Sequence, residues 1–266
     1  MLPCIDKGIT SFNINLYMNL DLDNILGDWP HEPGQIKVRK ILGNDGKEKL
    51  QLRIDLGLIQ MDVTGRPDGV KPHGFESLLA YHQQLAKKKE QGNESSMLTP
   101  DECGELQQEG IQYYHRYISF FQLKDYVGVI RDTQRNLDLC TFVTKHTDHE
   151  ELAWSLEQFR PYILMMNTRA KASIELDRDD YAGAMRHIEQ GKEKILAFYQ
   201  ETGNPEMAAK SPEITFLDEW LEEVKAKRPL TKLEVMQREM EKAISNEAYE
   251  RAAELRDKIR AYRTRE

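Results

Sequence analysis

The densest run of side chains that could bind a metal ion lies between His146 and Glu151. It contains His146, Asp148, His149, Glu150 and Glu151 within six positions, and imidazole and carboxylate groups are common zinc ligands. The same residues also suit the start of a helix, because an aspartate caps free amides and glutamates in the first turn complement the helix dipole. We favour the helix start, and the sequence therefore predicts no metal site and no cofactor.

The chain carries none of the short motifs that mark common catalytic sites. The sequence lacks a glycine-rich phosphate loop, a Gly-x-Ser-x-Gly nucleophile motif and a His-Glu-x-x-His zinc motif. Arg66 and Asp68 in a glycine-rich loop could contact a ligand, although a plain turn also explains them. We therefore predict no catalytic residue. An enzyme of unidentified reaction, with a site between a sheet and the helices, remains an alternative.

The composition indicates a helix-rich protein with charged outer faces. Of its 266 residues, 31% are charged and 39% are apolar, and the formal net charge is −8. An acidic chain does not as a whole attract DNA or anionic lipid. The sequence has no 18-residue apolar run, and Cys4, Cys103 and Cys140 lie too far apart for a zinc or disulfide pattern. We expect a cytoplasmic protein with no membrane partner.

Period-two alternation of apolar residues predicts a small antiparallel sheet over residues 35–63. Three alternating sets are separated by a Gly-Asn-Asp-Gly turn at 43–46 and by a change of parity near Gly57. These signals favour a three-stranded meander. An apolar helical face over residues 75–85 predicts a helix that covers the sheet. The segment 9–22 could hold a further strand or a short helix.

After residue 98 the periodicity is helical. Capping residues and prolines predict helix starts near residues 99, 125, 147, 179 and 211. The third of these helices is expected to be long and unbroken, from a cap at Thr147 or Asp148 to Ile174. Before this part, residues 87–96 are charged and polar and include Gly92, which suggests a linker and a domain boundary near 92–98.

A short repeat marks three of the predicted turns between helices. Residues 124–129 resemble residues 179–184, and residues 246–253 repeat the tyrosine and the small residue three positions later. A flat ring just after the turn and a small residue one turn later would let antiparallel helices approach closely. The pattern looks similar to tetratricopeptide-type hairpins, although its spacing is irregular. We predict a stack of helical hairpins.

The last segment, residues 230–266, predicts two short amphipathic helices joined by a tight turn. Thr231 can cap the first helix, with Glu234 completing a capping box, and Asn246 can cap the second. Apolar residues recur three or four positions apart in each half, at Leu233, Met236, Met240, Ala243, Ile244, Ala248, Tyr249, Ala252, Leu255, Ile259 and Tyr262.

The same tail resembles the UVR motif. The UvrB and UvrC subunits of bacterial nucleotide-excision repair share this motif with some Clp-type unfoldases and with the McsA adaptor. The resemblance rests on Met240, Ala243 and a Glu-x-Ala-Ala-x-Leu-Arg-Asp-x-Ile run over residues 250–259. Glu247 and Ala248 depart from the usual Leu-Asp-Phe-Glu turn. The motif is a binding module in its family. Together with the apolar stripes, the resemblance predicts ten partner-contacting residues here: Leu233, Met236, Met240, Ala243, Tyr249, Ala252, Ala253, Leu255, Arg256 and Ile259.

We interpret the chain as an α+β interaction protein without enzymatic activity. The predicted parts are a sheet-and-helix domain (1–91), a linker (92–98), a helical domain (99–228) and the hairpin (230–266). The hairpin would bind another protein or its own copy, and the resemblance implies partners from UvrB/UvrC-type repair or a Clp-type protease system. A nucleic-acid-binding repair protein is an alternative, because the chain ends in basic residues: Arg256, Lys258, Arg260, Arg263 and Arg265.

Overall fold

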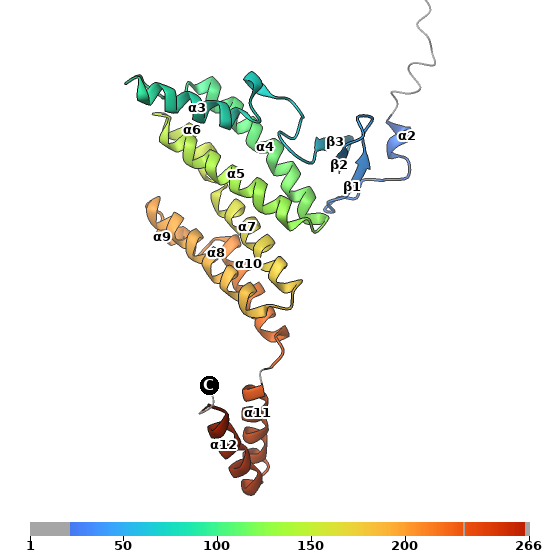
Figure 1. Ribbon diagram of the computed structural model, residues 1–266, viewed down its shortest axis with the longest axis vertical. Helices are drawn as coiled ribbons and strands as arrows, with labels where there is room; N and C mark the ends of the chain where they lie inside the picture. Colours follow the sequence, from blue (N-terminus) through green and yellow to red (C-terminus); the bar gives the residue numbers. More distant parts are fainter. Residues whose placement is uncertain (1–21, 231, 264–266) are drawn as a thin grey trace, which may run out of the picture.

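The computed structural model describes residues 22–230 and 232–263 (Figure 1). A short helix and three strands come first: α2 (Asp23–Leu26), β1 (Val38–Leu42), β2 (Glu48–Ile54) and β3 (Gly57–Asp62). The segment 9–21, where a strand or helix was expected, lies outside the described residues. The α+β class is confirmed, since a small antiparallel sheet precedes a chain of helices.

The sheet is the expected three-stranded meander, with strand order β1-β2-β3. The Gly-Asn-Asp-Gly turn joins β1 to β2, and the parity change is a tight reversal in which Ile54 pairs with Gly57. Leu56 was expected to continue the strand. It lies in the reversal instead and is 89% exposed, because the chain turns before its side chain can reach the apolar face.

The two faces of the sheet differ in chemistry. On one face Leu50 is fully buried and pairs with Met61 across the β2–β3 ladder. On the other face a polar ladder crosses all three strands: Arg39 Nε donates to Gln51 Oε1 at 2.8 Å, and Gln51 Nε2 donates to Gln60 Oε1 at 2.9 Å. The alternation places the apolar face toward the helices.

The helical part follows a 3-10 turn, η1 (Pro72–Gly74). Several predicted starts are confirmed, with a Thr99 capping box and side-chain caps at Asp125, Asp180 and Ser211. The helices are α3 (Leu78–Gln91), α4 (Pro100–Gln122), α5 (Tyr126–Lys145), α6 (Glu150–Glu157), α7 (Arg160–Leu176), α8 (Tyr181–Glu201), α9 (Pro205–Ala208) and α10 (Pro212–Lys227).

The single long helix expected over residues 147–174 is wrong. The chain forms α6 and α7 as separate helices, and the residue at the N-cap of α6 is His149 rather than Thr147 or Asp148. The break falls just before Pro161, which lies in the first turn of α7. A proline ring disfavours helical geometry in the residue before it, and proline has no amide hydrogen to continue a helix.

The sheet is covered by α4 rather than by the helix expected over residues 75–85. Leu50, Leu52 and Met61 share one buried cluster with residues of α4 and of the later helices. Leu79 on α3 belongs to a second cluster, with Leu106 at the other end of α4. In Figure 1 α3 lies beside the beginning of α4 and the sheet beside its end. The proposed domain boundary at 92–98 stays a prediction.

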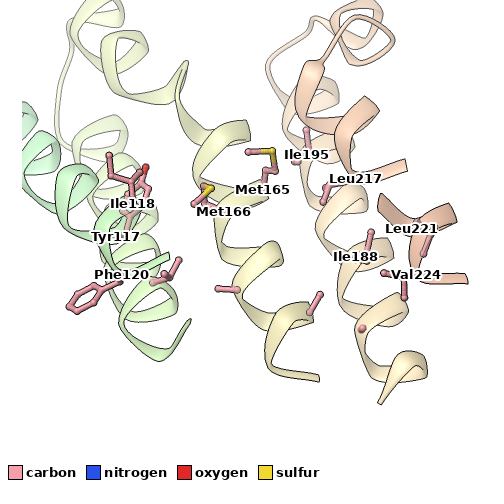
Figure 2. Packing of buried hydrophobic residues seen from close by; sticks show 14 of the residues in the cluster. Tyr117, Ile118, Phe120, Met165, Met166, Ile188, Ile195, Leu217, Leu221 and Val224 are labelled. Atoms are coloured by element: carbon pink, nitrogen blue, oxygen red, sulfur yellow. The ribbon is translucent and has the colours of Figure 1, made fainter. Parts of the chain in front are cut away.

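Figure 2 shows how the larger cluster is built. The side chains of α7, including Met165 and Met166, lie between those of α4 and those of α8 and α10. Ile188, Ile195 and Leu217 are fully buried there. The apolar stripes of the successive helices therefore close a continuous core along the stack.

Arg116 on α4 and Arg131 on α5 hold the loop after β3 against the helices. Arg131 donates to the carbonyl oxygen of Val63 at 3.0 Å. Arg116 donates to the carbonyl oxygens of Asp62 at 3.0 Å and Gly65 at 2.8 Å. Arg66 lies 3.0 Å from Oε1 of the buried Glu109 and 3.1 Å from Oδ2 of Asp68. Arg66 and Asp68 therefore have structural partners, as the plain-turn interpretation expects.

The three repeated turns share one backbone geometry. Lys124, Asp179 and Glu247 have φ values of +59°, +58° and +57°. In each turn the next amide donates back to a carbonyl five residues earlier, at 2.8–2.9 Å. Such a left-handed residue with a long backward hydrogen bond ends one helix and turns the chain into the next. The sequence repeat thus corresponds to a repeated structural turn.

A candidate partner-docking hairpin

The C-terminal hairpin consists of α11 (Lys232–Ser245) and α12 (Tyr249–Arg263), joined by the third repeated turn. Thr231, the expected cap of the first helix, lies outside the described residues. Asn246 is not the cap of the second, because α12 begins only after Ala248, whose carbonyl oxygen accepts from the Ala252 amide at 3.1 Å. An alanine cannot supply the side-chain acceptor that a capping position favours.

The inner seam of the hairpin buries four of the ten predicted contact residues. Ala243 of α11 is 7% exposed, and Leu255 of α12 is 2% exposed. Ala252 and Ile259 are buried with them. Small residues on both helices allow a close approach of the two axes. These four side chains hold the hairpin together and thereby position its outward-facing residues, and their contact with a partner stays a prediction.

The other six predicted contact residues are less buried than these four. Leu233, Met236, Met240 and Ala253 are half-buried, and Arg256 is exposed. Tyr249 is 67% exposed. The hairpin thus separates the predicted site into an inner and an outward-facing set.

Ile244 adds to the outward set. It is 51% exposed and lies four residues after Met240 and eleven after Leu233. These spacings put the three side chains on one face of α11. On α12 the spacing of four and seven residues likewise puts Tyr249, Ala253 and Arg256 on one face. The apolar periodicity includes Ile244, although it is not among the ten predicted contact residues. Met236 lies seven residues before the buried Ala243 and therefore on the inner face of α11. We call the other six residues the outer stripe: Leu233, Met240, Ile244, Tyr249, Ala253 and Arg256.

The hairpin packs little against the rest of the described chain. Neither buried core cluster takes a residue from α11 or α12 within the described ranges. Arg228 and Glu234 form an ion pair of 2.5 Å across the connection. Figure 1 shows the hairpin beyond the end of α10, joined by a single segment. The outer stripe is therefore not covered by the helical stack.

The described part of the basic end is partly neutralised. Arg256 lies 2.9 Å from the carboxylate of Asp257. Arg251, which precedes the basic end on the same helix, lies 3.0 Å from the carboxylate of Glu254. The side chains of Arg263 and Arg265 lie outside the described residues. These ion pairs reduce the positive charge that a phosphate backbone would meet.

His146, the first residue of the cluster from His146 to Glu151, is buried and has a structural partner. His146 is 5% exposed, and its Nδ1 lies 2.8 Å from the carbonyl oxygen of Phe142. Within residues 22–230 and 232–263, no three metal-binding side chains come together in a group that could hold an ion. In the same ranges no helix has the length and apolar character needed to cross a bilayer.

A family model described as the UvrB/uvrC motif, UVR, matches residues 231–265. The match covers the hairpin and confirms the resemblance, while the rest of the chain matches no family model. The UVR motif is a binding motif of UvrB/UvrC-type systems rather than a catalytic one. No curated protein and no solved structure matches the chain.

Proposed function

We propose that the chain is a protein-interaction protein, an adaptor whose outer stripe docks on another protein or on a second copy of itself. The supporting observation is the exposure of Tyr249 and Ile244, 67% and 51%, on a hairpin that uses its inner residues for its own closure. A two-helix hairpin has too few faces to bury every apolar side chain. Pairing with a second apolar hairpin would complete a small bundle.

The chemistry of the outer stripe supports a protein as the occupant. Leu233, Met240 and Ile244 offer an apolar surface, and Tyr249 offers a large ring of the kind that is enriched at protein interfaces. Arg256 adds a charge at the edge, where it can select the partner's orientation. By resemblance, the partner would carry a UvrB/UvrC-type or Clp-type surface.

The experiment compares two matched substitutions in the full chain. Ile244→Asp places a charge in the outer stripe, whereas Val235→Asp places it at a position of similar exposure, 40%, on another face of α11. Affinity purification from the native cell and the mass in solution are measured for each variant. We expect Ile244→Asp to lose the partner, or the second copy, and Val235→Asp to retain it.

Tyr249→Asp tests the same surface from α12 and should give the same loss. Amide hydrogen exchange of α11 and α12 shows whether each variant still forms the hairpin. The proposal is wrong if folded Ile244→Asp and Tyr249→Asp variants keep the mass and the partners of the unaltered chain. A change in mass alone identifies the partner as a second copy.

A further inference from the structure

Three helices of the stack present an aromatic surface arranged in two tiers. In the first tier the rings of Tyr114 on α4 and Tyr162 on α7 lie 6.2 Å apart. In the second tier the guanidinium of Arg169 lies 4.3 Å from the ring of Phe121 and 4.7 Å from that of Phe216 on α10. The second tier lies seven residues further along both α4 and α7, so these two helices run in the same direction.

A cavity of about 600 Å³ opens at the first tier. It lies between α4, α5, α6, α7 and α10, and most of its lining is apolar or aromatic. Tyr162 lines it, together with Ile111 and Phe159, which are 41% and 53% exposed. A cavity of this size and lining suits a large apolar side chain. Glu213, in the first turn of α10, is the acidic group of its lining.

The second tier holds a cation, Arg169, that has no carboxylate partner in the described part of the chain. Within the described ranges Arg169 forms no ion pair, and its hydrogen bond goes to Met166 Sδ at 3.6 Å. Burial between the rings lowers the pKa of this guanidinium, because a cation is costly to remove from water without a counter-charge. Aromatic faces attract a guanidinium but do not replace a carboxylate.

We propose that this aromatic surface, with the cavity at its first tier, binds an acidic peptide segment of a partner protein. A large apolar or aromatic side chain of the peptide would enter the cavity beside Tyr162, and a carboxylate would pair with Arg169. The carboxylate would supply the counter-charge that the second tier lacks. Glu213 at the first tier would repel a carboxylate there, which sets the direction of the peptide across the two tiers.

The helix spacing sets the separation of the two peptide groups. Seven residues from Tyr162 to Arg169 span about 10 Å at 1.5 Å per residue. An extended peptide covers about 3.3 Å per residue, so the apolar side chain and the carboxylate should be roughly three residues apart. The inference goes beyond the hairpin function, because it uses α4, α7 and α10 rather than the outer stripe.

The test begins by panning a random peptide library on the full chain. We expect enriched peptides to carry an aromatic or large aliphatic residue about three positions from an acidic residue. Fluorescence anisotropy then measures one enriched, labelled peptide. Arg169→Gln should weaken its binding about 10- to 100-fold, as the loss of a charge-assisted hydrogen bond predicts, and Arg169→Lys should weaken it less. Arg186→Gln, an exposed arginine on α8, is the matched control and should change nothing.

A second arm leaves the protein unaltered and changes the acid of the peptide to its amide. It should weaken binding as Arg169→Gln does, and the two changes together should cost no more than either alone. Ile244→Asp should leave peptide binding unchanged, which separates this site from the hairpin. The proposal is overturned if no peptide is enriched, if enriched peptides lack the acid, or if the amide peptide binds as tightly as the acidic one.

Discussion

Arg116 and Asp132 form a buried, bidentate ion pair. Arg116 Nε lies 2.7 Å from one carboxylate oxygen of Asp132, and a terminal nitrogen lies 2.9 Å from the other. Both side chains are 1% exposed. Since Arg116 also holds the loop after β3, the pair joins α4, α5 and the sheet in one network.

Removing one member of this pair should destabilise the chain strongly. Asp132→Ala leaves the Arg116 charge buried without its counter-charge, and we expect a loss of about 3–5 kcal/mol in the free energy of unfolding. Urea unfolding measures this loss. Glu222→Ala breaks the exposed pair with Lys225 and should cost less than about 1 kcal/mol. Equal losses in the two variants would contradict the assigned role.

A missing cap can be restored in the hairpin. Asp125 accepts from the Gly128 amide at 3.1 Å, and Asp180 accepts from the Gly183 amide at 2.8 Å. Ala248 occupies the equivalent position in the third turn, but its side chain has no hydrogen-bond acceptor. Ala248→Asp should stabilise α12 by about 0.5–2 kcal/mol, measured as slower amide exchange. Ala261→Asp, at the opposite end of α12, should give no gain because the helix dipole disfavours an anion there.

The repeated turn also makes Gly128 sensitive to substitution. A Cβ atom at this position would lie 2.8 Å from the ring of Phe120, which is fully buried. Gly128→Ala should therefore cost about 1–3 kcal/mol by overpacking. Gly104, inside α4, has no neighbour within 4 Å of its added Cβ, and Gly104→Ala should stabilise the helix by about 0.5–1 kcal/mol. Thermal unfolding of both variants tests the contrast, and two changes of the same sign would refute it.

The Cys140 thiol should be chemically inert in the folded chain. Burial raises its pKa to about 12, so at about pH 8 only roughly one thiol in ten thousand is ionised. The ionised fraction becomes large only when the pH approaches this raised pKa. Iodoacetamide should leave Cys140 unmodified in the native chain and modify it in denaturing guanidinium, as followed by peptide mass spectrometry. Rapid alkylation of the native chain would mean that the side chain is accessible.

Local signals predicted much of the helical part. Asp125, Asp180 and Ser211 act on amides three residues away, so their own sequence neighbourhood determines the helix starts. The alternation around Leu50 predicted the meander for the same reason. The break before Pro161 could also have been predicted, because proline restricts the residue before it.

Contacts between distant segments could not be predicted in this way. Apolar periodicity shows that Leu79 faces a core, but not whether that core is the sheet or α4. For the site, the family motif identified the hairpin. The division into inner residues such as Leu255 and outer ones such as Tyr249 depends on how the two helices meet. No sequence pattern around Arg169 marks it as part of a site, because its aromatic neighbours come from α4 and α10.

The single segment that joins α10 to α11 has a consequence for heat denaturation. Because Leu255 and its neighbours within the described hairpin contribute to neither large core cluster, the melting of one unit need not trigger the melting of the other. Calorimetry should then record a small endotherm for the tail beside the main one. A hairpin that folds and melts by itself can be transferred to another protein as an independent unit.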